Sequence, residues 1–113
     1  MTKEALVEKI IADLGANYSS DDEAVLTDIV GETITDALQI SNRKYMASVS
    51  AEAMSAQLDV LAPNIRKAVK SIYLMRGAED VKSMNQSGLN ASYENAVATM
   101  RDDIIKSGKR VMA

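Results

Sequence analysis

The sequence predicts an all-α fold, a small bundle of four to five helices, and three observations support that prediction. Apolar residues recur every three or four positions along most of the 113-residue chain. No stretch has the alternation expected of a strand, and no internal repeat is present. The chain is 47% apolar and 26% charged, which is typical of one globular domain spanning residues 1–113.

The first helix is expected over residues 3–14. Apolar residues lie at i, i+4 and i+8 from Leu6 to Leu14. Thr2 can cap the start of this helix, and Gly15 is a natural residue just beyond its end.

The second helix is expected over residues 20–40. Ser20 and Glu23 match a capping box, and Gly31 permits a neighbour to approach closely. Like charges at i, i+4 cost roughly 0.2–0.5 kcal/mol per pair, so the acidic outer face is either a solvated surface or the complement of a basic one. The acidic residues of this face are Asp28, Glu32 and Asp36.

Three further helices are expected over residues 51–61, 63–76 and 93–107. Pro63 suits the first position of a new helix, and Gly77 suits a helix end. The last helix has a narrow apolar seam typical of helix–helix contact, formed by Tyr93, Val97, Met100 and Ile104.

Two segments fall outside these helices. Residues 78–92 form a polar stretch, interpreted either as disorder or as a projecting arm that pairs with a partner. Residues 109–113 form a short basic C-terminal tail, which is expected to fray in a free monomer.

The composition excludes much catalytic chemistry. The chain has no Cys and no His, so it lacks a thiol nucleophile, a Cys-ligated metal and the usual neutral-pH base. Asp21 and Asp22 are interpreted as helix-start residues rather than paired catalytic acids. We therefore expect no enzyme activity, no catalytic residue, no cofactor and no metal.

The charge is unevenly distributed along the chain. Residues 1–60 have a net charge of −7 and residues 61–113 one of +4, within a total of −3. This is either the scatter of a short chain or the mark of a polar subunit whose two ends attract, within one chain or head-to-tail between copies. No apolar run reaches the roughly 20 residues of a membrane span, and the N-terminus has no leader-like pattern.

The C-terminal third resembles a known family. The residues concerned are the run Tyr73-Leu74-Met75-Arg76-Gly77-Ala78-Glu79, the pairs Ser87-Gly88, Ser92-Tyr93 and Met100-Arg101, and the stretch from Ile104 to Arg110. Together they are similar to the head–tail connector proteins of tailed bacteriophages, also called adaptor or DNA-packaging proteins. Met75 departs from the pattern, because a second basic residue is expected beside Arg76.

The resemblance implies a virion protein of the head–tail neck, assembled in the host cytoplasm. Such subunits form a ring of about a dozen copies by cyclic contacts beneath the portal protein. The ring extends the channel through which DNA passes without sequence-specific binding, involves no membrane, and offers a platform to a downstream neck or tail-completion protein. The partner-interface residues implied, with the Lys109–Arg110 tail docking on the portal, are Arg76, Glu79, Ser87, Gly88, Tyr93, Arg101, Lys109 and Arg110.

Two other functions stay open. One is a helical DNA-binding or regulatory module that uses Arg66, Lys67 and Lys70, with the break between Leu61 and Pro63 imitating a helix-turn-helix. The other is a phage scaffold or another capsid-completion protein.

Overall fold

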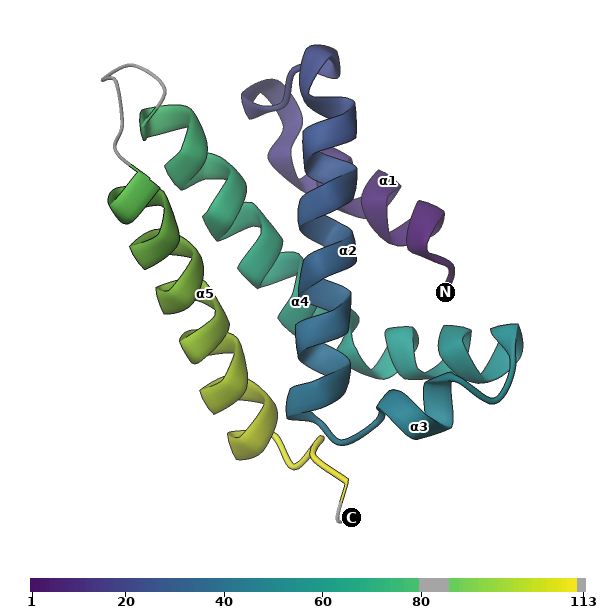
Figure 1. The fold of residues 1–113 in the computed structure, drawn as a ribbon. Helices are drawn as coiled ribbons and strands as arrows, with labels where there is room; N and C mark the ends of the chain where they lie inside the picture. Colours follow the sequence, from purple (N-terminus) through teal and green to yellow (C-terminus); the bar gives the residue numbers. More distant parts are fainter. Residues whose placement is uncertain (80–85, 112–113) are drawn as a thin grey trace.

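Five α-helices and two 3₁₀ turns make up nearly all of the described chain, so the all-α prediction is confirmed. The computed structural model describes the backbone of residues 1–79 and 86–111, and the side chains of those residues outside 76–92. Figure 1 shows the helices α1 (Lys3–Leu14), α2 (Glu23–Ile40), α3 (Lys44–Ala47), α4 (Ala51–Glu79) and α5 (Gln86–Lys106).

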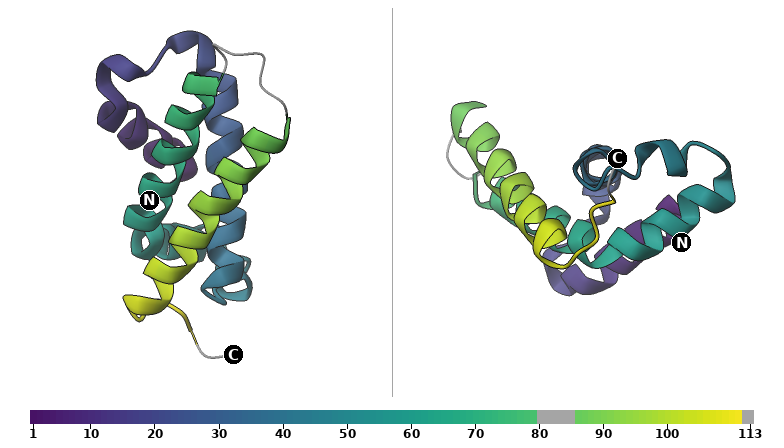
Figure 2. Two further views of the ribbon diagram at one scale, coloured as in Figure 1. Left: turned by 90° about the vertical axis from the view of Figure 1, so that its left-hand side faces the viewer. Right: turned by 90° about the horizontal axis from the view of Figure 1, so that it is seen from below.

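Helix α4 is the central element, because it packs against each of the other four helices. Helices α2 and α5 lie along its second half, and α1 crosses beside α2 (Figures 1 and 2). Burial of apolar side chains from four helices in one core provides most of the driving force for folding. The described apolar residues with no exposed surface are Leu6, Ile10, Leu26, Val30, Ala37, Leu61, Ile65, Val69 and Ile104.

The predicted ends of the first helix are confirmed. The Thr2 hydroxyl oxygen accepts a hydrogen bond from the Ala5 amide at 3.1 Å. Gly15 follows with φ +54°, a conformation that a side chain disfavours. The α5 seam is confirmed at Met100 and Ile104, which are buried.

The second helix begins at Glu23 instead of Ser20, so the predicted capping box is wrong. Residues Ser20–Asp22 form a 3₁₀ turn. A contact with α4 explains this start: the Tyr73 hydroxyl donates to the Asp22 carboxylate at 2.6 Å and accepts from the Ser19 amide at 3.3 Å. Both bonds hold the residues just before α2 against α4. A local capping pattern cannot predict such a contact, because Tyr73 is distant in the sequence.

The predicted break before Pro63 is also wrong, because α4 runs without interruption from Ala51 to Glu79. Pro63 removes the amide that would bond to the carbonyl four residues earlier, at a typical cost of about 3 kcal/mol and with a kink. The ribbon of α4 indeed changes direction midway (Figure 1). The helix continues because Leu61 and Ile65, on either side of the proline, are both fully buried. Gly77 likewise lies inside α4.

The predicted polar arm over residues 78–92 is not confirmed. Residues 78–79 are the end of α4, residues 86–92 are the first turns of α5, and residues 80–85 lie outside the described part of the chain. Ser, Asn and Gln are only moderately worse helix formers than Ala. Once the later turns of α5 are packed, each added residue gains a backbone hydrogen bond without a new nucleation cost.

The prediction of a frayed basic tail is wrong for residues 109–111. The Val111 amide donates to the Ser41 carbonyl at 2.8 Å, and the Asn42 side-chain amide donates to the Val111 carbonyl at 3.0 Å. Arg43 Nε donates to the Lys109 carbonyl at 2.9 Å. The loop between α2 and α3 therefore clamps the tail by tertiary hydrogen bonds, which have no local sequence pattern. Residues 112–113 lie outside the described range.

Replacing Arg43 tests this clamp. Arg43 Nη1 also donates to the side-chain oxygen of the buried Gln57 at 2.8 Å. Arg43→Ala leaves that oxygen and the Lys109 carbonyl without this donor, so the free energy of unfolding should fall by about 1–3 kcal/mol in urea titrations. Lys44→Ala, which removes an exposed neighbour, is the control and should change it by less than about 0.5 kcal/mol. Equal effects of the two variants would contradict the clamp.

Candidate functional site

The predicted interface residues fall into two groups. Four of them occupy the ends of α4 and α5, within the segment whose side chains are not described: Arg76, Glu79, Ser87 and Gly88. The other four are placed by α5 and the docked tail: Tyr93, Arg101, Lys109 and Arg110.

Of this second group, three residues meet at the surface between α2 and α5, and Lys109 does not. Arg101 and Arg110 line one pocket together, and the Tyr93 hydroxyl donates to Asp36, which lines the same pocket. The ammonium of Lys109 instead donates to the side-chain oxygen of the buried Asn64 at 2.7 Å, on α4. Lys109 therefore supports the fold of its own chain.

The pocket between the C-terminal halves of α2 and α5, which we call the arginine pocket, has a volume of about 290 Å³. The docked tail brings Arg110 to the same pocket as Arg101 of α5. Because guanidinium groups bind carboxylates through two parallel hydrogen bonds, such a pocket can hold an acidic side chain. It is lined by Asp36, Gln39, Ile40, Val97, Arg101, Ile105 and Arg110.

Tyr93 ties α5 to α2 beside this pocket. Burial raises the pKa of Tyr93, and the hydrogen bond to Asp36 and the charges of Asp36 and Glu32 raise it further. The partner of Asp36 is thus a neutral phenol and not a cation. At Asp36 the acidic face is therefore not simply solvated, because this carboxylate is bonded to Tyr93 and shares its pocket with Arg101 and Arg110.

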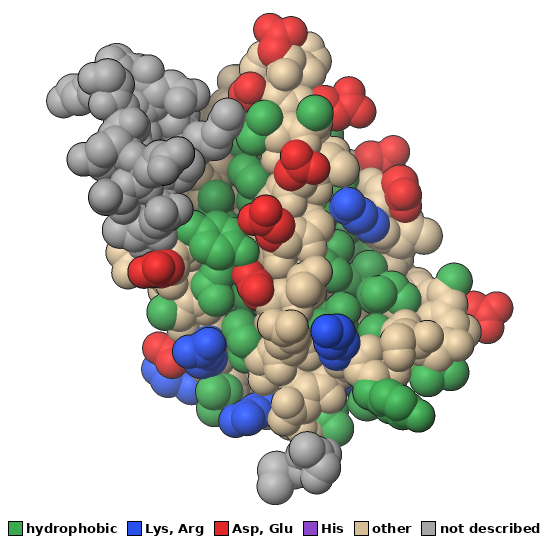
Figure 3. Space-filling view, in the orientation of Figure 1, with side chains coloured by type: hydrophobic (Ala, Val, Ile, Leu, Met, Phe, Trp, Pro, Cys, Tyr) green, Lys and Arg blue, Asp and Glu red, His purple; other side chains and the backbone are tan. Residues whose placement is uncertain are grey.

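Asp28 and Glu32 form an exposed pair of carboxylates one turn apart on α2, which we call the acidic ridge. No Lys or Arg occurs between Lys9 and Arg43 in the sequence, so α2 has no basic residue at all. In Figure 3, acidic side chains follow the upper part of α2, whereas basic side chains lie at the lower left, beside the C-terminal end of α5, and also to the right of α2. Asp28 and Glu32 form none of the described ion pairs, although the Lys3 ammonium lies close to Gly31 on the same helix.

Part of the charge difference between the two halves of the chain is neutralised within the chain. Arg66 donates two hydrogen bonds, of 2.8 and 2.9 Å, to the Asp13 carboxylate, and Lys70 lies 3.5 Å from it. The hydrogen bond from Arg66 is the main reason that the pKa of Asp13 is lowered. Lys67 pairs with Asp103 at 3.0 Å. Among the ion pairs of the described residues, none uses Arg101 or Arg110.

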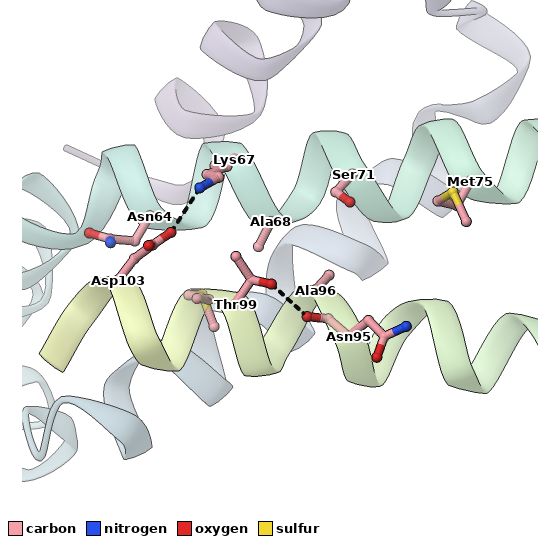
Figure 4. A pocket seen from close by; sticks show the side chains of 10 residues that line it. Asn64, Lys67, Ala68, Ser71, Met75, Asn95, Ala96, Thr99 and Asp103 are labelled. Atoms are coloured by element: carbon pink, nitrogen blue, oxygen red, sulfur yellow. Dashed lines mark hydrogen bonds and ion pairs between the residues drawn. The ribbon is translucent and has the colours of Figure 1, made fainter. Parts of the chain in front are cut away.

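A second pocket, of about 180 Å³, separates α4 from α5. Small side chains, including Ala68, Ala96 and Ser71, leave this space, and the Lys67–Asp103 pair lies at one end (Figure 4). The Thr99 hydroxyl donates to a carbonyl of its own helix at 3.0 Å. The pocket is thus a gap between small residues with few polar groups free to bind a ligand.

Sequence reasoning missed an exposed apolar surface at α3. The side chains of Tyr45 and Val49 are 83% and 70% exposed, and Met46 is beside them at 38%. We call these three residues the apolar corner. Helix α3 and the first half of α4 diverge from α5 as a separate arm when the molecule is seen from below (Figure 2). The sequence feature that could have predicted this surface is the presence of three large apolar residues in segment 41–50, which has no helical periodicity.

Two further properties of the described residues bear on binding. None of their helices has both the length and the apolar character that crossing a bilayer requires. No group of three or more acidic side chains among them is arranged to hold a metal ion. The exposed surfaces above are therefore the features from which a function can be inferred.

Tyr93→Phe tests the link between α5 and α2. Because the folded protein keeps the phenol proton to higher pH than the unfolded chain, this stabilisation is complete below about pH 10 and is lost as the pH rises further. The variant should lose about 1 kcal/mol at neutral pH. Its urea midpoint should also fall less than that of the wild type between about pH 8 and about pH 11. Tyr45→Phe at an exposed site is the control; identical falls in wild type and Tyr93→Phe would contradict the link.

Comparison of the chain with protein-family models, curated proteins and solved structures finds no match. The candidate site is therefore defined by the chain's own surfaces. These are the arginine pocket, the acidic ridge and the apolar corner.

Proposed function

We propose that this chain is a structural, non-enzymatic subunit of a phage head–tail connector. In this role it forms a ring beneath the portal protein, extends the DNA channel and presents a platform for a downstream neck or tail-completion protein. The main supporting observation is that an exposed acidic ridge on α2 and a pocket lined by two arginines at the end of α5 lie at different places on one face.

Separated charges of opposite sign favour contacts between unlike surfaces of neighbouring copies. Head-to-tail contacts of that kind close into rings when the rotation between copies permits. The ridge and the pocket arginines stand outside the described ion pairs, so both are available to a neighbour. A net charge of −3 also suits a DNA conduit, because DNA affinity grows with the number of phosphates that Lys and Arg neutralise.

The apolar corner supports a second contact, with the portal protein. Tyrosine is enriched at energetically important positions of protein interfaces, and 83% exposure of Tyr45 leaves a large area to bury. The sequence resemblance assigned this contact to the Lys109–Arg110 tail. Since both the carbonyl and the ammonium of Lys109 are bonded within the chain, we assign the contact to the apolar corner instead.

The DNA-binding alternative has less support. Arg66 and Lys70 lie against Asp13, and Lys67 lies against Asp103, so the cations of the presumed recognition helix already have partners. No turn separates Leu61 from Pro63, because both lie inside α4. A sequence-specific, steeply salt-dependent shift of duplex DNA in a gel would favour this alternative over the connector.

Native mass spectrometry and negative-stain imaging of the chain, with and without the cognate portal, test the proposal. We expect closed rings, or addition of copies to the underside of the portal. The control is portal alone under the same conditions. A stable dimer that ignores the portal would contradict the proposal.

The double variant Tyr45→Ser, Val49→Ser tests the assigned portal contact. Addition to the portal should fall at least about tenfold, because interface tyrosines often contribute more than 1.4 kcal/mol. The free energy of unfolding should change by less than about 0.5 kcal/mol, because both side chains are exposed in the free chain. Val60→Ser, at an exposed position of α4 outside the corner, is the control. Unchanged portal binding of the double variant would remove the corner from the interface.

A further inference from the structure

We infer that the arginine pocket of one copy receives the acidic ridge of another copy of this chain. The contact joins Arg101 and Arg110 of one molecule to Asp28 and Glu32 of the next. That the copies are arranged head-to-tail, so as to close a ring, rests on the proposed function. The pairing itself rests on the charges and exposure of these four residues.

The pocket is suited to a carboxylate. Two arginines, Arg101 and Arg110, line it against one acidic residue, Asp36, so its lining has an excess of one positive charge, and Asp36 also accepts a hydrogen bond from Tyr93. Ile105 is 47% exposed at the pocket and provides apolar surface that a packed partner would cover. Two arginines beside an apolar surface are typical of protein interfaces, where arginine is enriched and lysine depleted.

The ridge is suited to enter such a pocket. Asp28 and Glu32 lie one turn apart, and their mutual repulsion costs roughly 0.2–0.5 kcal/mol until a cation relieves it. Gly31 lies between them and Thr35 follows one turn after Gly31, and the flexible Lys3 side chain reaches Gly31 from α1. The hydroxyls of Thr27 and Thr35 donate to carbonyls of their own helix, at 2.8 and 3.1 Å. A partner can therefore cover this surface, because both hydroxyl protons already have a hydrogen-bond acceptor.

The partner must be a separate molecule. Both surfaces include residues of α2, and eight residues of helix, a rise of about 12 Å, separate Asp28 from Asp36 of the pocket. A rigid helix cannot place its own ridge in a pocket that it helps to form. Within one chain the ridge therefore does not enter the arginine pocket.

A second copy fits better than a nucleic acid. Phosphates would pair with the arginines, but the adjacent ridge and an α2 helix with no basic residue would repel them. In a head-to-tail contact, a second copy brings its carboxylates to the arginines of the first, and its own arginines receive the carboxylates of a third copy. The contact should therefore weaken as salt screens it.

Charge reversal and rescue test the pairing in the full chain, with association measured by native mass spectrometry and sedimentation. Arg101→Glu should weaken association at least about tenfold. Adding either Asp28→Lys or Glu32→Lys, whichever faces residue 101, should restore it to within about threefold, because that pair again has opposite signs while Arg110 keeps an acidic partner. The control is Lys106→Glu, which removes a basic residue of the same helix outside the pocket lining and should have less than a threefold effect. Equal effects of Arg101→Glu and Lys106→Glu, or no rescue, would overturn the pairing.

Crosslinking separates this inference from the proposed function. The chain has no cysteine, so Thr35→Cys on the ridge side and Ile105→Cys at the pocket can be joined by a short bis-maleimide. The double variant should give a ladder of species that depends on Arg101, and each single variant at most a dimer. A ladder that stops at the dimer would support the pairing and overturn the head-to-tail ring. Rings on the portal without ridge-to-pocket crosslinks would overturn the pairing and leave the proposed function standing.

Discussion

Burial of α4 among four other helices is the constraint on which the rest of the structure depends. Leu61, Ile65 and Val69 place one side of α4 in the core, and every other helix contacts α4. The burial outweighs the hydrogen bond lost at Pro63, so the helix bends where it would otherwise end. The bend directs the first half of α4 away from α5. With α3, that half presents the apolar corner to solvent.

Two tyrosines connect the acidic α2 region to the helices that cover it. Tyr73 donates to Asp22 and Tyr93 to Asp36, and the pKa of each tyrosine is raised by these carboxylates and by burial. A neutral phenol satisfies a carboxylate oxygen without cancelling its charge. The α2 helix is thereby held in the bundle and keeps its negative charge toward solvent.

The charged side chains therefore fall into two groups: those that form ion pairs within the chain and those that do not. Those of the α4 face, Arg66, Lys67 and Lys70, pair within the chain and tie α1 and α5 to α4. On the α2–α5 face, the described ion pairs include none of the ridge acids or pocket arginines, which are Asp28, Glu32, Arg101 and Arg110. An assembly subunit needs both kinds, because internal pairs stabilise the monomer and separated charges direct one copy toward the next. The arrangement is consistent with the proposed connector role and explains how a mildly acidic chain could still attract its own copies.

The sequence alone determined the helical class, the limits of α1 and the apolar seam of α5, because periodicity and caps depend on neighbours within a turn. It also pointed to Tyr93, Arg101 and Arg110. Tertiary structure decided the continuity of α4 through Pro63, the start of α2, the helical residues of the expected arm and the docking of the tail. Each depends on packing or hydrogen bonds between distant segments, such as Tyr73 with Asp22 or Arg43 with Lys109. Local propensities differ by about 1 kcal/mol or less for most residues, so such contacts override them.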